Sequence, residues 1–374
     1  MWLLLFVTLA IALALLPLIP AILELVYPTD IKPLNIEYDY DRNIRRFAER
    51  FSHMLRKEIS ILYTQEESIE LSAEKAVPPK LFALPNLPLA LKEHEVQQQQ
   101  LNRRLIGLGT LKLPANMKFN QEIYAENDLI GGEKNHIRAA VAENTIFLAP
   151  HTIVSRWIHA REIKISHNVK LYGRTSGKEK ISFEGSAFFE RLHAPIICFG
   201  NEIEKNLSTK NFQPTPFQPA VDIGNSFQHY SNDNRSIAIG DFKLPPNSVF
   251  EGNLIVKGNL NLSKGVIING SVKVHGKTIL ESEVTIHGAL IGIDTILCGK
   301  SCSIDGPIVS EKEIDIMSDC RLGHEDKPTS INSPIIKIDA NNTVVYGTVW
   351  AAKQGIVYLL ENDNNKNPFI SNVC

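Results

Sequence analysis

The chain has 374 residues, with 39 Lys and Arg against 41 Asp and Glu, and 44% of its residues are hydrophobic. So balanced a charge offers no global basic face of the kind that binds nucleic acid, and the hydrophobic content is that of an ordinary folded protein. Five cysteines in so long a chain do not make a disulfide framework, and their odd number leaves at least one thiol unpaired within the chain. This cysteine usage favours a reducing compartment.

Residues 1–27 predict a transmembrane anchor. The first 23 residues carry no charged side chain, and about 20 apolar residues in a helix suffice to cross the hydrocarbon core of a bilayer. A cleaved signal peptide would have a basic start and a small-residue cleavage site, and neither is evident. Basic residues are frequent from Lys32 to Lys57, whereas only the terminal amine precedes the apolar run. The positive-inside rule then predicts a single-pass protein whose C-terminal domain lies in the cytoplasm.

Residues 28–104 predict a juxtamembrane amphipathic helix and a linker. Apolar residues between Ile44 and Leu62 recur at steps of three and four, so they share one helical face, and the basic residues lie off it. Two interpretations stay open: the helix rests on anionic lipid headgroups, or its apolar face caps the first coil of the following domain. The Pro-rich and Gln-rich sequence after the helix is typical of a linker.

An 18-residue repeat governs residues 105–355. Corner glycines stand at Gly252, Gly270, Gly288 and Gly306. The other columns that keep this step are Phe250, Ile268, Ile286, Ile304 and Leu322; Leu254, Val272, Leu290 and Ile308; Leu260, Thr278, Ile296 and Ile314; Leu262, Leu280, Cys298 and Ile316; and Val266, Val284, Cys302 and Cys320. Within each repeat, apolar and polar residues alternate in three short strands. The sequence therefore predicts an all-β fold, a parallel β-helix solenoid.

The repeat divides into two predicted segments. The first covers residues 105–199, with Leu111, Leu129, Phe147 and Ile165 in one inward column. The pattern lapses over residues 200–236, which are typical of an inserted loop. It resumes over residues 237–355, and we expect residues 356–374 to form a C-terminal cap or tail. Because both inward columns of each strand are large, we expect a core wider than that of a left-handed hexapeptide helix, in which one inward column is small.

The stretch that begins at Phe250, FEGNLIVKGNLNLSKGVIINGSVKVHGKTILESEVTIHGALIG, resembles the bactofilins, the polymer-forming cytoskeletal proteins of bacteria. Residues 336–355, IKIDANNTVVYGTVWAAKQG, resemble the last coils of membrane-anchored members. The resemblance implies a right-handed β-helix that associates end to end without a nucleotide. It also implies a non-catalytic scaffold at the bacterial inner membrane that positions cell-envelope enzymes.

Two motifs with chemical associations have simpler interpretations. Residues 276–278 and 299–301 end like phosphate loops, but the glycine required five residues earlier is absent from both, so we expect no nucleotide. Cys298, Cys302, Cys320 and His324 have a spacing seen in zinc sites. The three cysteines fall in inward columns, however, where a thiol packs as a small hydrophobic group. We therefore assign no metal, no cofactor and no catalytic residue.

Several histidines remain as candidates for binding. His275 and His287 fall at outward positions beside corner glycines, where we expect solvated side chains. His151, Trp157 and His159 are more suggestive, because an aromatic ring with two imidazoles on neighbouring coils can form a binding ledge. A tryptophan such as Trp157 is, however, more often a core residue than part of a binding site.

The expected partners are other copies of the chain through the β-helix ends, membrane lipid through the N-terminal helix, and cell-envelope enzymes. Neither nucleic acid nor nucleotide is expected. Two alternatives stay open. One is a β-helix acyl- or sugar-modifying enzyme, which a polar cleft on one face would favour. The other is a periplasmic glycan-binding rod that displays the loop at residues 200–236.

Overall fold

The computed structural model describes Trp2, Phe6, Arg45 and residues 48–55, 81–83, 98–107, 109–200, 215–216, 227–230 and 234–359. The chain divides into two units, residues 1–43 and residues 44–374, and the described strands belong to the second unit. The predicted anchor, residues 1–27, lies outside the described residues except for Trp2 and Phe6. Within the described part of the chain, no helix combines the length and the apolar character needed to cross a bilayer.

The second unit is a parallel β-solenoid of about 13 coils over residues 100–358. Residues 48–55 form a helix. The strands of the first segment are β1 (Leu81–Ala83), β2 (Gln100–Leu101), β3 (Leu105–Gly107), β4 (Leu111–Lys112), β5 (Lys118–Ala125), β6 (Leu129–Ile130), β7 (His136–Ala142), β8 (Thr145–Leu148), β9 (Ile153–Ile165), β10 (Val169–Phe183) and β11 (Ala187–Phe199). The second segment begins with β12 (Thr215–Pro216), β13 (Phe227–Tyr230), β14 (Arg235–Ala238), β15 (Phe242–Leu244), β16 (Ser248–Glu251), β17 (Asn253–Val256), β18 (Leu260–Leu262), β19 (Ile267–Asn269), β20 (Val272–Val274) and β21 (Thr278–Leu280). It continues with β22 (Thr285–Ile286), β23 (Leu290–Gly292), β24 (Ile296–Cys298), β25 (Ser303–Ile304), β26 (Ile308–Ser310), β27 (Glu313–Ile316), β28 (Arg321–Leu322), β29 (Thr329–Asp339) and β30 (Thr343–Tyr358).

The register of the second segment confirms the predicted columns. From β14 to β28, each strand pairs in parallel with the strand one coil later, so Leu260 lies beside Thr278, Thr278 beside Ile296, and Ile296 beside Ile314. All four side chains are buried. The strict 18-residue step therefore places like residues above one another and builds the core from repeated columns.

The corner glycines are required by close backbone approach. A Cβ atom at Gly270 would lie 2.2 Å from the carbonyl oxygen of Gly252, and one at Gly288 would lie 2.5 Å from that of Gly270. No side chain fits at such distances, because successive turns stack backbone on backbone at this corner.

One predicted column of the first segment is wrong. Leu129 pairs with Ile146, and Phe147 pairs with Ile130 instead. This coil is one residue shorter than the repeat, so a step of 18 from Leu129 reaches the neighbouring residue, whose side chain points to the other side of the strand. Ile146 is fully buried, whereas Phe147 is not.

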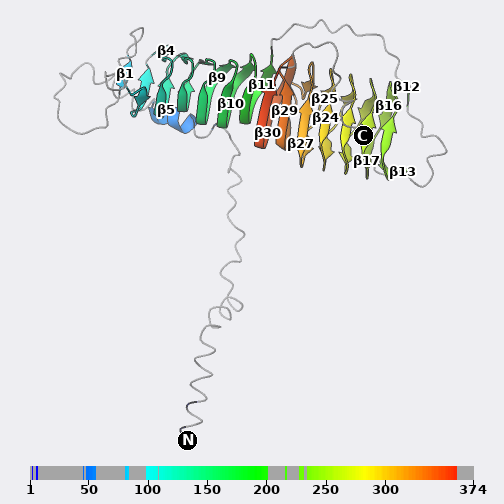
Figure 1. The fold of residues 1–374 in the computed structure, drawn as a ribbon. Helices are drawn as coiled ribbons and strands as arrows, with labels where there is room; N and C mark the ends of the chain where they lie inside the picture. The colour runs from blue at the N-terminus through cyan, green and yellow to red at the C-terminus, as the bar shows by residue number, and fades with distance from the viewer. Residues whose placement is uncertain are drawn as a thin grey trace, which may run out of the picture. The chain divides into compact units, whose positions relative to one another are not determined.

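The two segments run in opposite directions and join at their last coils (Figure 1). Strand β11, which ends the first segment, pairs antiparallel with β30, which ends the second, through ten residue pairs from Ala187–Val357 to Phe199–Thr343. We call this contact the joint. Residues 356–358, assigned from the sequence to a cap, instead complete β30, and Ile356 and Val357 belong to the joint. Residues 360–374 lie outside the described part of the chain.

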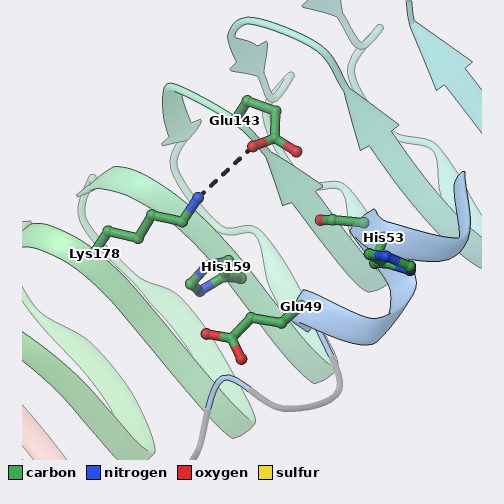
Figure 2. A pocket seen from close by; sticks show the side chains of 6 residues that line it. Glu49, His53, Glu143, His159 and Lys178 are labelled. Atoms are coloured by element: carbon green, nitrogen blue, oxygen red, sulfur yellow. Dashed lines mark ion pairs between the residues drawn. The ribbon is translucent and has the colours of Figure 1, made fainter. Parts of the chain in front are cut away.

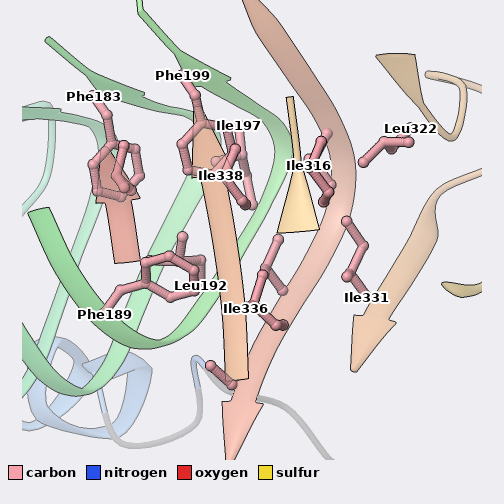
Figure 3. Packing of buried hydrophobic residues seen from close by; sticks show 14 of the residues in the cluster. Phe183, Phe189, Leu192, Ile197, Phe199, Ile316, Leu322, Ile331, Ile336 and Ile338 are labelled. Atoms are coloured by element: carbon pink, nitrogen blue, oxygen red, sulfur yellow. The ribbon is translucent and has the colours of Figure 1, made fainter. Parts of the chain in front are cut away.

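The core is continuous across the joint. Figure 3 shows aromatic side chains of the first segment beside isoleucines of the second. The Phe183 and Phe199 rings stack with centroids 5.0 Å apart, and Ile197 pairs with Val345 of β30. Buried residues of both segments form one hydrophobic cluster. The joint is thus a packed interior rather than a surface contact.

Candidate functional site

The helix at residues 48–55 lies on a side face of the first segment. Its Ala48 and Leu55 pack against an outward column that runs through Ile106, Tyr124 and Val141 on successive coils. Phe51 meets the ring of Trp157 edge-on, with centroids 5.7 Å apart, and Arg45 donates a hydrogen bond to the Gly177 carbonyl at 3.1 Å.

The helix therefore covers the flank of several coils, and not the end of the first coil as one interpretation of the sequence predicted. Its apolar stripe is matched by outward apolar residues of the solenoid, which would otherwise face water. The alternative interpretation, a helix on anionic lipid, stays a prediction.

The covered column becomes polar as it continues along the solenoid. Val141 pairs with His159, His159 with Ser176, Ser176 with His193, and His193 with Thr348 across the joint. The Nδ1 atom of His159 lies 2.8 Å from the Ser176 hydroxyl, and the Nδ1 atom of His193 lies 2.9 Å from the Thr348 hydroxyl. Each imidazole is thus oriented by a hydroxyl on the neighbouring strand, that of β10 for His159 and that of β30 for His193.

A cavity of about 200 Å³ opens where the helix meets this polar part of the column. Figure 2 shows its lining: Glu49, Ser52 and His53 from the helix, with Glu143, His159 and Lys178 from the solenoid. The Lys178 ammonium lies 3.7 Å from a Glu143 carboxylate oxygen, and the Tyr124 hydroxyl lies 3.3 Å from the other. The cavity thus brings both signs of charge to one place.

His159 is the most buried member of this lining, with only 2% of its surface exposed. Its Nδ1 atom is taken by Ser176, while its Nε2 atom is buried and has no hydrogen-bond partner among the described residues. Burial, followed by the positive charges of Lys178 and Arg45, lowers the pKa of His159 to about 4. The imidazole is therefore neutral at pH 7.

Of the three residues of the predicted ledge, the structure brings two together. Trp157 and His159 lie beneath the helix, whereas His151 is in an exposed turn, its ring edge-on to His167 with centroids 5.8 Å apart. Glu143 and Lys178 were not predicted from the sequence. The signal that could have found them is the change of one outward column from apolar to polar where the amphipathic helix ends.

A second polar group lies on an exposed corner of the second segment. The Nδ1 atom of His287 and the Nε2 atom of His324 lie 2.7 and 2.8 Å from the two carboxylate oxygens of Asp305. Burial acts to raise the pKa of Asp305, but the two hydrogen bonds outweigh it and hold that pKa below its ordinary value. The side chain of His287 is exposed, as predicted, but it is hydrogen-bonded to Asp305.

The cysteines and His324 do not meet. Cys298, Cys302 and Cys320 lie in the core, and the thiols of Cys302 and Cys320 contact the carbonyls of Glu281 and Gly299 at 3.2 Å. Burial raises the pKa of Cys298, and the Cys302 side chain together with burial raises that of Cys320. His324 points outward to Asp305.

In the part of the chain that the structure describes, no group of three or more His, Cys, Asp or Glu residues is arranged to hold a metal ion. Comparison with protein-family models, curated proteins and solved structures finds no match. The class of the protein is therefore described from its structure: it is a parallel β-solenoid with two segments joined at their last coils and a charged cavity on one flank.

Proposed function

We propose that the protein is a membrane-tethered bacterial scaffold of the bactofilin type, which self-associates through the ends of a right-handed β-helix and positions cell-envelope partners without catalysis. The joint carries this proposal. There, one end coil of this sequence docks on another through ten residue pairs and a shared core. Strands with an unpaired edge accept further strands readily.

The outer end of the second segment offers such an edge at β15. This strand pairs with β18, and it pairs with no other strand that the structure describes. The N–H group of Phe242 donates to Asn259 at 2.8 Å, and the carbonyl of Leu244 accepts from Ser263 at 3.3 Å. Because backbone groups alternate along a strand, the N–H and carbonyl groups of Lys243, between them, point away from β18.

The substitution Lys243→Pro tests the proposal. Proline removes the outward N–H group and leaves the hydrogen bonds to β18 in place, since the strand already has an extended conformation. Lys243→Thr is the matched control, because it removes the same charge and keeps the N–H group. With the purified full-length chain and no nucleotide, we expect wild type and Lys243→Thr to form extended assemblies by electron microscopy and light scattering. We expect Lys243→Pro to form much shorter ones.

A monodisperse monomer of the wild-type chain would remove self-association from the proposal. If Lys243→Pro forms assemblies of the same length as those of wild type, the edge of β15 does not take part in self-association. Thermal unfolding of both variants checks that they fold.

The tether rests on the uncharged residues 1–23 and the basic residues that follow them. Deleting residues 1–27 should move the protein from the membrane fraction to the soluble fraction. A reporter fused to the C-terminus of the intact chain should be active only if it functions in the cytoplasm. Reporter activity confined to the periplasm would contradict the proposed location.

A further inference from the structure

The cavity under the helix contains a buried nitrogen that the described protein does not satisfy. His159 Nδ1 is bonded to Ser176, and Nε2, at the other end of the ring, has no partner among the described residues. Nearly all buried polar groups in folded proteins are hydrogen-bonded, and an exception needs an explanation. A molecule bound in the cavity supplies one.

The lining selects for a ligand with both charges. Glu49 and Glu143 supply carboxylates, which attract an ammonium group, and a carboxylate has about four acceptor positions. Lys178 has three donors, of which one faces Glu143. Neutral His159 adds a hydrogen-bonding group without adding charge.

The volume limits the ligand to a small molecule. At about 30 Å³ for each water in the liquid, a cavity of about 200 Å³ corresponds to roughly seven water molecules. Small amino acids have about this number of non-hydrogen atoms.

We propose that this cavity binds a small zwitterion of the amino-acid class, with its ammonium group on Glu49 and Glu143, its carboxylate on Lys178, and a hydrogen bond to His159 Nε2. Such a ligand contacts the helix and the solenoid together, so its binding fastens residues 48–55 to the flank of the coils. This inference is independent of self-association.

The probes are alanine and γ-aminobutyrate, which separate the two charges by different distances, and butylamine and butyrate, which carry one charge each. Ligand-observed NMR on the purified full-length chain measures their binding, and hydrogen exchange measures the protection of residues 48–55. We expect at least one zwitterion to bind and to slow exchange in the helix. Each single-charge analogue should bind at least roughly tenfold more weakly than the zwitterion, because one charged hydrogen bond is lost.

Two variants separate the site from the fold. His159→Asn keeps an amide near Nδ1 for Ser176 and removes Nε2, so it should weaken the zwitterion roughly tenfold. His193→Asn is the matched control, since His193 makes the same kind of bond to Thr348 but does not line the cavity. If His159→Asn fails to fold, Lys178→Met replaces it as the test of the ligand carboxylate.

Three results would overturn the proposal. One is no binding of either zwitterion to the wild-type chain. Another is binding of butylamine or butyrate as tight as that of the zwitterions, which would indicate a site for a single charge. The third is equal weakening by His159→Asn and His193→Asn, which would place the effect outside the cavity.

Discussion

Single residues in the core columns differ in whether their polar atoms are satisfied. Thr278 is fully buried between Leu260 and Ile296, and its hydroxyl has no partner among the described residues. Thr343 is equally buried, but its hydroxyl donates to the Met317 carbonyl at 3.1 Å. A buried hydroxyl without a partner destabilises a fold, whereas a bonded one does not.

We therefore expect Thr278→Val to raise the free energy of unfolding by about 1 kcal/mol, because valine has the same shape and no hydroxyl. Thr343→Val should lower it by about 1 kcal/mol, since it removes a made bond. Urea unfolding of the two variants measures both changes. Effects of the same sign in the two variants would contradict this reasoning.

The buried imidazole of His159 makes stability depend on pH. Its pKa in the folded chain is about 4, below the ordinary 6.5, so between these values the unfolded chain binds a proton that the folded chain does not. Above pH 6.5 His159 is neutral in both the folded and the unfolded chain, and its contribution to the free energy of unfolding is fully present. As the pH falls from 6.5 toward 4, protonation of the unfolded chain lowers the free energy of unfolding, by roughly 3 kcal/mol for the full shift. Burial also lowers the pKa of His193, which adds to the loss.

His159→Gln removes this ionisation. Between about pH 7 and about pH 5, we expect its free energy of unfolding to fall less than that of wild type in urea titrations. An equal fall in both proteins would mean that His159 is accessible to protons in the folded chain.

At the scale of the strand and turn, the coils depend on how closely their corners stack. A Cβ atom at Gly270 would meet the Gly252 carbonyl at 2.2 Å, a backbone atom that cannot rotate away. At Gly292 the nearest atom would be Ile296 Cγ1 at 3.0 Å, on a side chain that can move. Only the first position excludes every side chain.

Gly270→Ala should therefore lower the free energy of unfolding by at least about 1–3 kcal/mol, the usual cost of overpacking. Gly292→Ala should cost clearly less. Thermal unfolding monitored by circular dichroism compares them, and equal losses would show that the corner spreads to admit a methyl group.

The strands could be predicted from the sequence where the coils repeat regularly. The columns from Phe250 to Leu322 could be read directly, because every coil there has 18 residues. Phe147 was misplaced because one coil is a residue shorter. The joint could not be predicted, since a single antiparallel contact between β11 and β30 leaves no repeat in the sequence. In the cavity, His159 stood out, but Lys178 and Glu143 looked like ordinary surface charges.

At the scale of the whole second unit, the joint links two solenoids into one core. Residues 356–358 contribute Val357, which is buried beside Ala187, and Tyr358, whose hydroxyl donates to Asp315 at 2.9 Å. A chain that ends after Gly355 loses these contacts, whereas a chain that ends after Leu359 keeps all of them.

We expect the chain ending at Gly355 to be less stable by at least about 1.5–3 kcal/mol, the contribution of one buried valine. Its melting temperature should fall, and the chain ending at Leu359 should melt like the full-length protein. Differential scanning calorimetry measures these melting temperatures. Equal values for the chain ending at Gly355 and the full-length chain would show that the fold does not depend on the last three residues of β30.

The reversed order of the two segments also sets the timing of synthesis. His193 of β11 meets Thr348 of β30 across 155 residues of chain. At 5–20 residues per second, the ribosome takes roughly 8–30 s to make that interval. During this time β11 has no partner strand on the edge that later pairs with β30. The nascent protein thus passes through a stage at which its future centre is an open sheet edge, where a chaperone or a second nascent chain could bind before β30 arrives.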